Sequence, residues 1–220
     1  MTSAQGVKVI LCGESTVGKT TLLKAITGQN VNEPISPTMA AAFTILTLKN
    51  PQNGEKIVFN IWDTAGQEAY RSLIKVYFRT VQIALIVFDV TNSETFEKID
   101  QWINDINSNA GTEKYKCIIV ANKLDRESER TVTKEELSQK GFLHGTRFVE
   151  VSAMTGENIN DLKNLLIEMH NNPMATRPRL KSIYRKEPIP VDPQDDELLP
   201  ENHYSTVILT EGKKKHNCCK

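Results

Sequence analysis

Near its amino terminus the chain reads Gly13-Glu14-Ser15-Thr16-Val17-Gly18-Lys19-Thr20. The apolar run of residues 7–12 precedes this stretch, and a helical pattern over residues 21–26 follows it. Gly13 and Gly18 permit the positive φ angles that let successive backbone N–H groups point at one spot, where the helix adds the positive end of its dipole. The arrangement of strand, glycine-rich turn and helix predicts a phosphate-binding loop.

The side chains of this loop have separate predicted roles. Lys19 reaches the β- and γ-phosphates of a nucleotide as a point charge, and the Thr20 hydroxyl contacts the Mg²⁺ that bridges the same oxygens. An ordinary strand-to-helix corner is the alternative interpretation, in which Ser15 and Thr16 are simply small residues that keep the turn clear. The predicted phosphate contacts are Gly13, Ser15, Thr16, Val17, Gly18, Lys19, Thr20 and Thr21.

Composition limits the function classes. The 220 residues are enough for one ordinary domain with an appendage, and the 27 Lys and Arg residues balance the 27 Asp and Glu residues. The net charge of zero therefore gives no electrostatic reason to expect nucleic acid as a partner. Cys12 and Cys117 lie in apolar runs and Cys218-Cys219 near the end, which is neither a disulfide framework nor a zinc spacing, so we expect a cytosolic protein. Without a signal peptide or a run of about eighteen apolar residues, any membrane attachment is expected to be added chemically.

Apolar runs alternate with helical patterns along the first 172 residues. This alternation predicts an α/β fold with a six-stranded, mostly parallel sheet, one antiparallel edge strand and helices on both faces. Asn53-Gly54 is a hairpin signal between the second and third strands. The predicted strands are 7–12, 42–48, 56–63, 83–88, 117–120 and 147–151. The predicted helices are 21–26, a short one ending near residue 78, 94–107, 134–140 and 159–170.

The composition changes at Pro173. Six of the nine prolines lie at or beyond this residue, together with a basic stretch over 177–186 and an acidic stretch over 192–201. We therefore expect residues 1–172 to form the domain and residues 173–220 to form a flexible tail.

Three further motifs follow the ends of predicted strands, at the sheet edge where the phosphate loop also lies. Asp63-Thr64-Ala65-Gly66-Gln67 offers a carboxylate near the Mg²⁺, a glycine N–H to the γ-phosphate and an amide that orients water. In Asn122-Lys123-Leu124-Asp125, the Asp125 carboxylate matches two hydrogen-bond donors of guanine that adenine lacks. Ser152-Ala153 offers a backbone N–H to the guanine carbonyl. Each motif alone is a common loop composition, but together with the phosphate loop they predict GTP binding.

These residues resemble the Ras-superfamily small GTPases over residues 8–170, and within them the Rab branch. The branch resemblance rests on residues 38–43, 61–63, 69–73, 77–79 and 86–91 and on the terminal cysteine pair. The resemblance implies the small G domain of the P-loop NTPases. It also implies that Thr38, with Thr20 and Asp63, holds the Mg²⁺ and that Gln67 positions the attacking water. Phe43, Trp62 and Tyr77 resemble the aromatic cluster that effectors read, and core packing is the alternative for these rings.

By this resemblance the chain is a switch that binds GTP or GDP with Mg²⁺, hydrolyses GTP and recruits effectors to membranes in vesicle trafficking. A GTPase-activating protein, an exchange factor, effectors, a prenylation escort and a dissociation inhibitor are the implied partners. One alternative is an ATP-using P-loop protein, against which Asp125 argues. The other is a constitutively nucleotide-bound membrane scaffold, against which Gln67 argues.

The chain departs from the family pattern near the base. Met39-Ala40 stands where Ile-Gly is usual, and Met154 stands where the family has a lysine. The segment between Thr20 and Phe43 holds no aromatic residue to lie on the guanine edge, with Val31 or a neighbour as a weak substitute, which predicts looser nucleotide retention.

The tail carries the expected membrane signal. Cys218 and Cys219 resemble the doubly geranylgeranylated ends of the Rab branch, although Lys220 follows them. Two lipids give stable anchoring, and residues 213–215 are lysines that favour an anionic leaflet. Residues 207–209 resemble the element that the prenylation escort grips, with a chance apolar cluster as the alternative. The alternative for the whole end is a solvated basic segment with two unreactive thiols. We expect the protein on the cytoplasmic face of an intracellular membrane, with a cytosolic pool.

Overall fold

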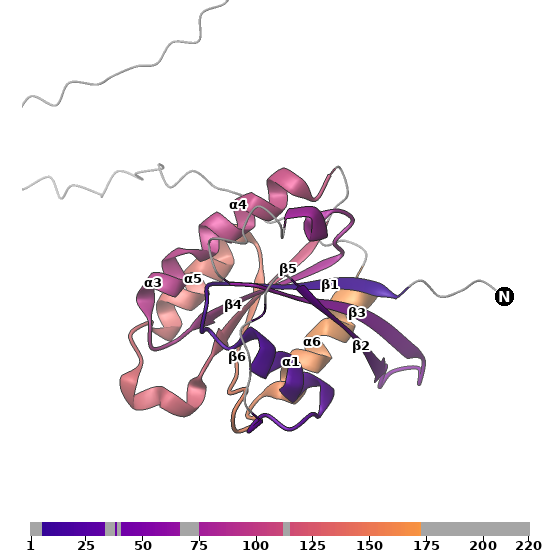
Figure 1. The fold of residues 1–220 in the computed structure, drawn as a ribbon, viewed down its shortest axis with the longest axis horizontal. Helices are drawn as coiled ribbons and strands as arrows, with labels where there is room; N and C mark the ends of the chain where they lie inside the picture. Colours follow the sequence, from indigo (N-terminus) through magenta and orange to yellow (C-terminus); the bar gives the residue numbers. More distant parts are fainter. Residues whose placement is uncertain (1–5, 34–37, 39–40, 67–74, 112–114, 173–220) are drawn as a thin grey trace, which may run out of the picture. The chain divides into compact units, whose positions relative to one another are not determined.

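A computed structural model describes residues 6–33, 38, 41–66, 75–111 and 115–172. Its centre is one six-stranded sheet with the order β2-β3-β1-β4-β5-β6, shown edge-on in Figure 1. Every neighbouring pair is parallel except β2 with β3. The expected fold, a mostly parallel sheet with one antiparallel edge strand, is confirmed. The strands are β1 (Val7–Cys12), β2 (Ala41–Lys49), β3 (Lys56–Thr64), β4 (Ile83–Asp89), β5 (Lys116–Asn122) and β6 (Arg147–Glu150).

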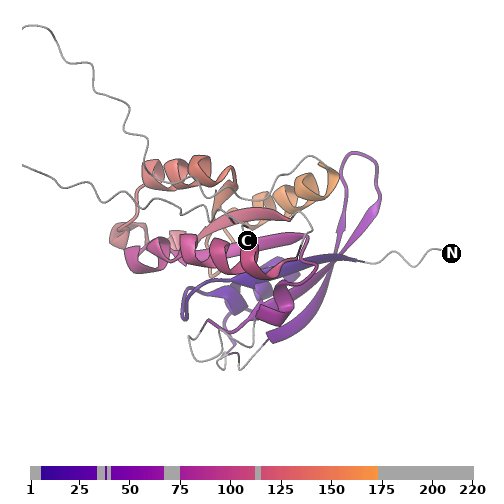
Figure 2. The same ribbon diagram turned by 90° about the horizontal axis from the view of Figure 1, so that it is seen from above.

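Helices cover both faces of the sheet (Figures 1 and 2). On one face α1 and α6 pack over a core that includes Leu22, Phe59 and Leu166. On the other face α4 and α5 pack over a second core that includes Trp102 and Leu137. The α-helices are α1 (Lys19–Thr27), α3 (Ser93–Glu97), α4 (Ile99–Asn109), α5 (Lys134–His144) and α6 (Ile159–Asn171). The 3-10 helices are η2 (Lys75–Phe78) and η3 (Leu124–Glu129).

β4 lies between the two hydrophobic cores of the protein. All seven of its residues are buried, because α1 and α6 cover one face and α4 and α5 the other. A strand buried on both faces reads as one continuous apolar run rather than an alternating one. The two buried thiols also lie in central strands, and burial raises the pKa of Cys12 to about 12, so this thiol is unreactive at neutral pH.

The β2–β3 hairpin forms, but Asn53-Gly54 is not its whole turn. Lys49 still pairs with Lys56, and residues 50–55 form the connection between them. The Asn50 carbonyl accepts from the Gly54 N–H at 2.8 Å, and Gly54 has a φ of 76°. The glycine therefore supplies the left-handed step that returns the chain to β3.

Two helical predictions need correction, and one helix was not predicted. The pattern over 94–107 forms two helices, because Lys98 ends α3 and precedes α4. Its ψ angle of −10° departs from the usual α-helical value of about −42°. The helix predicted to end at Lys140 continues through Gly141 to His144 and ends where Gly145 takes a φ of 62°. A Cβ on Gly141 would lie 3.0 Å from Phe148 Cδ1, so the glycine inside α5 makes room for the β6 side chain. No element was predicted for residues 124–129, where the structure has the 3-10 helix η3.

Candidate functional site

The phosphate loop joins β1 to α1 with three residues in left-handed conformations. The φ angles are 141° at Gly13, 65° at Thr16 and 91° at Gly18. A Cβ on Gly13 would lie 2.1 Å from the Val87 carbonyl oxygen, so β4 lies directly behind the loop. A non-glycine residue such as Thr16 rarely adopts this conformation, and such strain clusters at functional sites.

The start of α1 leaves backbone donors for an anion. Gly18 occupies the cap position, and among the described residues no side chain caps this helix end and no acid lies in its first turn. The first N–H groups of a helix have no intrahelical partner, and the helix dipole makes this end positive. The loop therefore presents donors and partial positive charge at one place.

Lys19 places a buried cation in the loop. Its side chain is 6% exposed, and its Nζ donates to the carbonyl oxygens of Gly13 at 2.9 Å and Glu14 at 2.7 Å. Burial lowers the pKa of Lys19, while the carboxylates of Asp63 and Glu14 oppose that shift. A Cβ on Gly66 would lie 2.4 Å from the Lys19 Nζ, so the backbone after β3 passes against the ammonium.

Asp63, Thr20 and Thr38 bring oxygen atoms together from three parts of the chain. Asp63 at the end of β3 is fully buried, and its Oδ2 accepts from the Thr20 hydroxyl at 2.6 Å. The hydroxyl oxygens of Thr20 and Thr38 are 3.2 Å apart. Asp63 Oδ1 is buried and has no hydrogen-bond partner among the described residues. Burial raises the pKa of Asp63, against the hydrogen bond from Thr20 and the charge of Lys19.

This oxygen set fits Mg²⁺, which binds through one or two carboxylates together with waters and substrate phosphates. The orphaned Asp63 oxygen is the observation that supports the fit, because a buried polar atom usually has a partner. In the described part of the chain, no group of three or more His, Cys, Asp or Glu side chains could hold a metal by itself.

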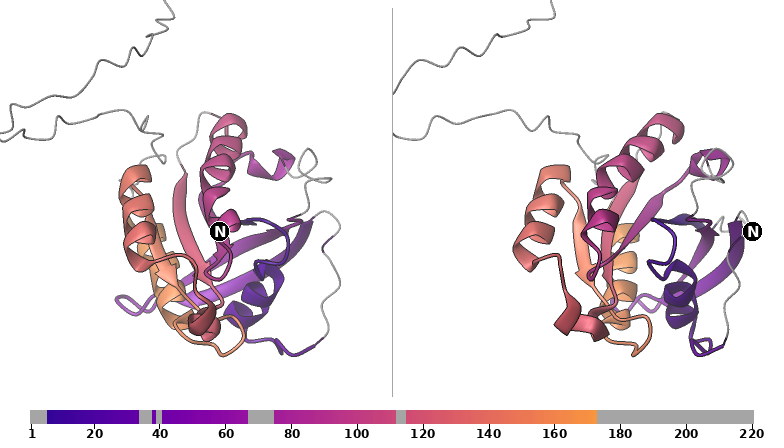
Figure 3. Two further views of the ribbon diagram at one scale, coloured as in Figure 1. Left: turned by 90° about the vertical axis from the view of Figure 1, so that its left-hand side faces the viewer. Right: turned by 60° about the vertical axis from the view of Figure 1, so that its left-hand side comes forward.

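Asn122 connects the base-site motifs to the phosphate loop. Its side chain is 2% exposed at the end of β5, and its Nδ2 donates to the Val17 carbonyl at 2.8 Å. Its Oδ1 accepts from the Ala153 backbone N–H at 3.1 Å. A Cβ on Gly18 would lie 2.5 Å from the same Nδ2. The phosphate loop, the loop after β5 and the loop after β6 therefore meet at one amide group. Figure 3 shows the ribbons of these segments side by side at one end of the sheet.

Asp125 is exposed and oriented by a neighbour. The hydroxyl of Ser152, itself fully buried, donates to Asp125 Oδ1 at 2.5 Å and accepts from the Thr155 N–H at 3.1 Å. The other Asp125 oxygen remains for donors outside this pair. A backbone N–H of Ser152-Ala153 was predicted to meet the guanine carbonyl. In this structure the Ala153 N–H donates to Asn122 Oδ1 and the Ser152 N–H donates to the Glu157 carbonyl, each at 3.1 Å.

Lys123 is fixed by a residue that was not predicted as part of the site. Its Nζ lies 2.6 Å from Asp89 Oδ2, and its φ is 71°. Burial opposes ionisation of Asp89, but hydrogen bonds from Lys123 and Thr91 prevail and lower the pKa of Asp89. Asp89 ends β4 next to β5, so its place at the carboxyl edge of the sheet was the available signal.

The sequence is similar to a known protein family and to individual proteins. The sequence model of the Ras family matches residues 8–171. The chain belongs to the Ras family. Ras-related protein RabC of Dictyostelium discoideum is 33% identical over 161 residues, covering 73% of this chain and 82% of the relative. Ras-related protein Rab-13 of Mesocricetus auratus is 35% identical, covering 72% and 77%. Ras-related protein RABA5c of Arabidopsis thaliana is 32% identical, covering 96% and 93%.

The predicted membership is confirmed, and the chain is a Rab-like small GTPase. The four motifs that carried the prediction are the ones that the fold gathers at one edge of the sheet. Gln67 lies outside the described residues, as do Met39-Ala40 and the tail from residue 173 with Cys218 and Cys219. No helix among the described residues is long and apolar enough to cross a membrane.

The three aromatic residues of this GTPase form one continuous cluster. The ring centroids of Phe43 and Trp62 are 4.9 Å apart, and those of Trp62 and Tyr77 are 5.1 Å apart. Trp62 and Tyr77 are partly buried against the core that includes Trp102 and Leu137, whereas Phe43 is 49% exposed. A cavity of about 620 Å³ lies beside the cluster, and Phe43, Trp62 and Lys8 are among its lining residues. Core packing therefore accounts for part of this cluster but not for the exposed Phe43 ring.

Proposed function

We propose that this Rab-like GTPase binds GTP and GDP with Mg²⁺ and hydrolyses GTP slowly as a membrane-recruited switch. The observation that carries the proposal is the meeting of Lys19, Asp63 and the Thr20 hydroxyl within one loop system. A buried cation, a buried carboxylate with an unpartnered oxygen and a helix N-terminus form a site for phosphate and a divalent ion together.

The residues of the site divide the work. The loop amides and Lys19 hold the phosphates, and the Asp125 carboxylate accepts from the guanine base while Ser152 orients it. Thr20, Thr38 and Asp63 would hold Mg²⁺. When bound, this ion neutralises charge that develops on the phosphate oxygens.

Hydrolysis depends on Gln67, which we assign to orienting the attacking water. No arginine occurs between Gly28 and Phe43 to stabilise the transition state from within the chain. Slow intrinsic turnover therefore follows, together with an arginine supplied by an activating partner, worth about 10³–10⁵ in rate.

Membrane and partner binding use separate parts of the chain. Phe43, Trp62 and Tyr77 are assigned to effectors, which is supported by the exposed ring at one end of the cluster. The G domain spans residues 1–172, and the tail of residues 173–220 carries geranylgeranyl groups on Cys218 and Cys219. An exchange factor, a prenylation escort and a dissociation inhibitor complete the cycle between the cytosol and an intracellular membrane.

Nucleotide competition tests the proposal. Fluorescent GDP should be displaced by GTP and GDP but not by ATP, and EDTA should accelerate its release. Asp125→Asn should lose guanine preference and gain affinity for xanthine nucleotides, whose extra carbonyl suits an amide donor. Displacement by ATP, or unchanged guanine preference in Asp125→Asn, would overturn the base-site assignment.

A further inference from the structure

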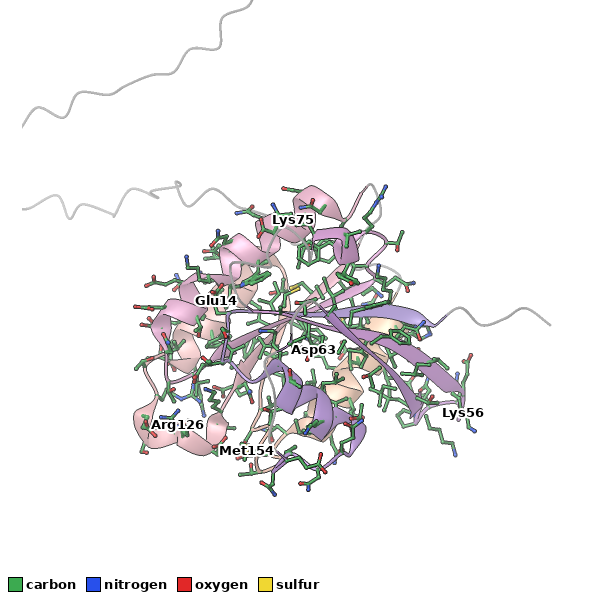
Figure 4. All side chains as sticks on the ribbon, in the orientation of Figure 1. Glu14, Lys56, Asp63, Lys75, Arg126 and Met154 are labelled. Atoms are coloured by element: carbon green, nitrogen blue, oxygen red, sulfur yellow. The ribbon has the colours of Figure 1, made fainter. Side chains whose placement is uncertain are left out.

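A hydrogen bond connects the phosphate loop to helix α4. The indole Nε1–H of Trp102 donates to Glu14 Oε1 at 3.0 Å, joining residues 88 positions apart. Trp102 is 2% exposed and lies in the core beneath α4. In Figure 4, Glu14 lies on the side of the sheet that α3 and α4 cover. The contact therefore lies at the edge of the core, where the buried indole N–H meets the half-buried Glu14 carboxylate as its acceptor.

Glu14 lies within the phosphate-binding machinery through its backbone. Its carbonyl oxygen accepts from the Lys19 Nζ at 2.7 Å. The same oxygen lies 2.5 Å from the position of a Cβ on Gly66, so the loop after β3 passes against it. The direction of the Glu14 carbonyl thus sets where the Lys19 ammonium lies.

The side chain of Glu14 fixes that direction. Gly13 before it and Thr16 two residues after it have left-handed backbones, and Ser15 and Thr16 are exposed, so this part of the loop lies at the surface. A hydrogen bond between a carboxylate and a buried donor is among the stronger side-chain contacts. The rigid indole, packed in the core of α4, gives the loop an attachment on the opposite side from α1.

We infer that Trp102 is a positioning residue for the phosphate loop, acting through Glu14 to hold the Lys19 ammonium and the loop amides in their phosphate-binding arrangement. This inference rests on the proposed nucleotide site. It assigns nucleotide retention to a residue on α4 that belongs to none of the sequence motifs. By the same inference, a contact that moves α4 changes the position of the phosphate loop through Trp102 and Glu14.

A double-mutant cycle on full-length protein loaded with fluorescent GDP tests the inference. Trp102→Phe removes the donor and keeps an aromatic ring, and Glu14→Ala removes the acceptor. Each should accelerate GDP release about tenfold, as expected for the loss of one hydrogen bond to a charged group. The double variant should release GDP no faster than the faster single variant, because both remove the same contact. Independent roles would multiply to about a hundredfold.

Two further variants separate the hydrogen bond from other effects. Glu14→Gln keeps an acceptor oxygen but replaces a charged acceptor with a weaker neutral one, so it should release GDP faster than the original protein and more slowly than Glu14→Ala. Tyr115→Phe is the matched control, because it removes a buried aromatic donor to Asn107 Oδ1 on the same helix, away from the loop. It should leave GDP release unchanged.

Spectroscopy reads the contact directly. The chain has two tryptophans, so the indole N–H signal that disappears in Trp102→Phe belongs to Trp102. Glu14→Ala should move that signal, and Tyr115→Phe should not. Additive release rates, or a Glu14→Gln variant as fast as Glu14→Ala, would overturn the inference. Failure of the original protein to bind guanine nucleotide would instead overturn the proposed function.

Discussion

Asn122→Ala removes the amide that ties the base-site loops to the phosphate loop. The side chain is 2% exposed and makes two hydrogen bonds, from its Nδ2 to the Val17 carbonyl and from the Ala153 N–H to its Oδ1. The substitution leaves a buried carbonyl and a buried N–H without these partners. Each unsatisfied group costs about 1–3 kcal/mol.

We take the expected loss of binding free energy from the lower end of that range. Two groups at about 1 kcal/mol each give about 2 kcal/mol, which corresponds to about 30-fold in the dissociation constant for GDP. The loss falls on nucleotide binding because both bonds join loops of the site rather than elements of the core. The dissociation constant and the release rate of fluorescent GDP should therefore both rise.

Titration calorimetry and GDP release on the purified chain measure the effect, with circular dichroism as a check on folding. Asn109→Ala is the matched control, since its Nδ2 donates to the Asp105 carbonyl at 2.7 Å at the far end of α4. It should bind GDP normally. If Asn122→Ala bound GDP within twofold of the original protein, the three loops would not depend on this amide and the reasoning would fail.

Three other changes test separate parts of the molecule. Gln67→Leu should leave GTP affinity intact and slow single-turnover hydrolysis, most visibly with an activating partner, and equal rates would refute its role. Asp100→Asn should weaken the dependence of the free energy of unfolding on acid pH. Hydrogen bonds from His144 and Lys140 lower the pKa of Asp100 despite its partial burial. The stability that these bonds contribute is therefore complete above the ordinary aspartate pKa of 3.8 and is lost as the pH falls below it. Urea unfolding between pH 2 and pH 6 would show no difference from the original protein if the pair were unimportant. Changing both Cys218 and Cys219 to serine should keep GTP binding and abolish membrane attachment, and intact mass of the membrane fraction would expose an error by showing an unmodified carboxyl terminus.

The sheet was predictable because its strands are simple apolar runs. β4 and β5 match their predicted ranges closely, since strands buried on both faces need apolar residues at every position. The helices were harder to delimit. The helix predicted over 134–140 continues through Gly141, which the position of Phe148 explains. η3 was not predicted, and its ion pairs of Arg126 with Glu129 and Arg130 with Glu127 depend on its folded turns.

The candidate site divides in the same way. The motifs place the right residue types at the ends of strands, because spacing along the chain determines which loops meet at one edge. The contacts between motifs are tertiary, and no spacing predicts them. The bond from Asn122 to Val17 spans 105 residues, and the bond from Trp102 to Glu14 spans 88. The motifs therefore named residues that the fold brings together, but not Asp89 and Trp102, which contact them from β4 and α4.

β3 gives the nucleotide site and the aromatic cluster a common support. Trp62 and Asp63 are consecutive residues of this strand, so their side chains point to opposite faces, one toward Phe43 and Tyr77 and the other toward Thr20. The antiparallel register then pairs Phe43 with Trp62 and Ala42 with Asp63. Thr38, five positions before Phe43, contacts the same Thr20 hydroxyl. A change in the contacts of Asp63 therefore acts next to Trp62 in β3, and a change in the contacts of Thr38 acts on the segment that leads to Phe43 in β2.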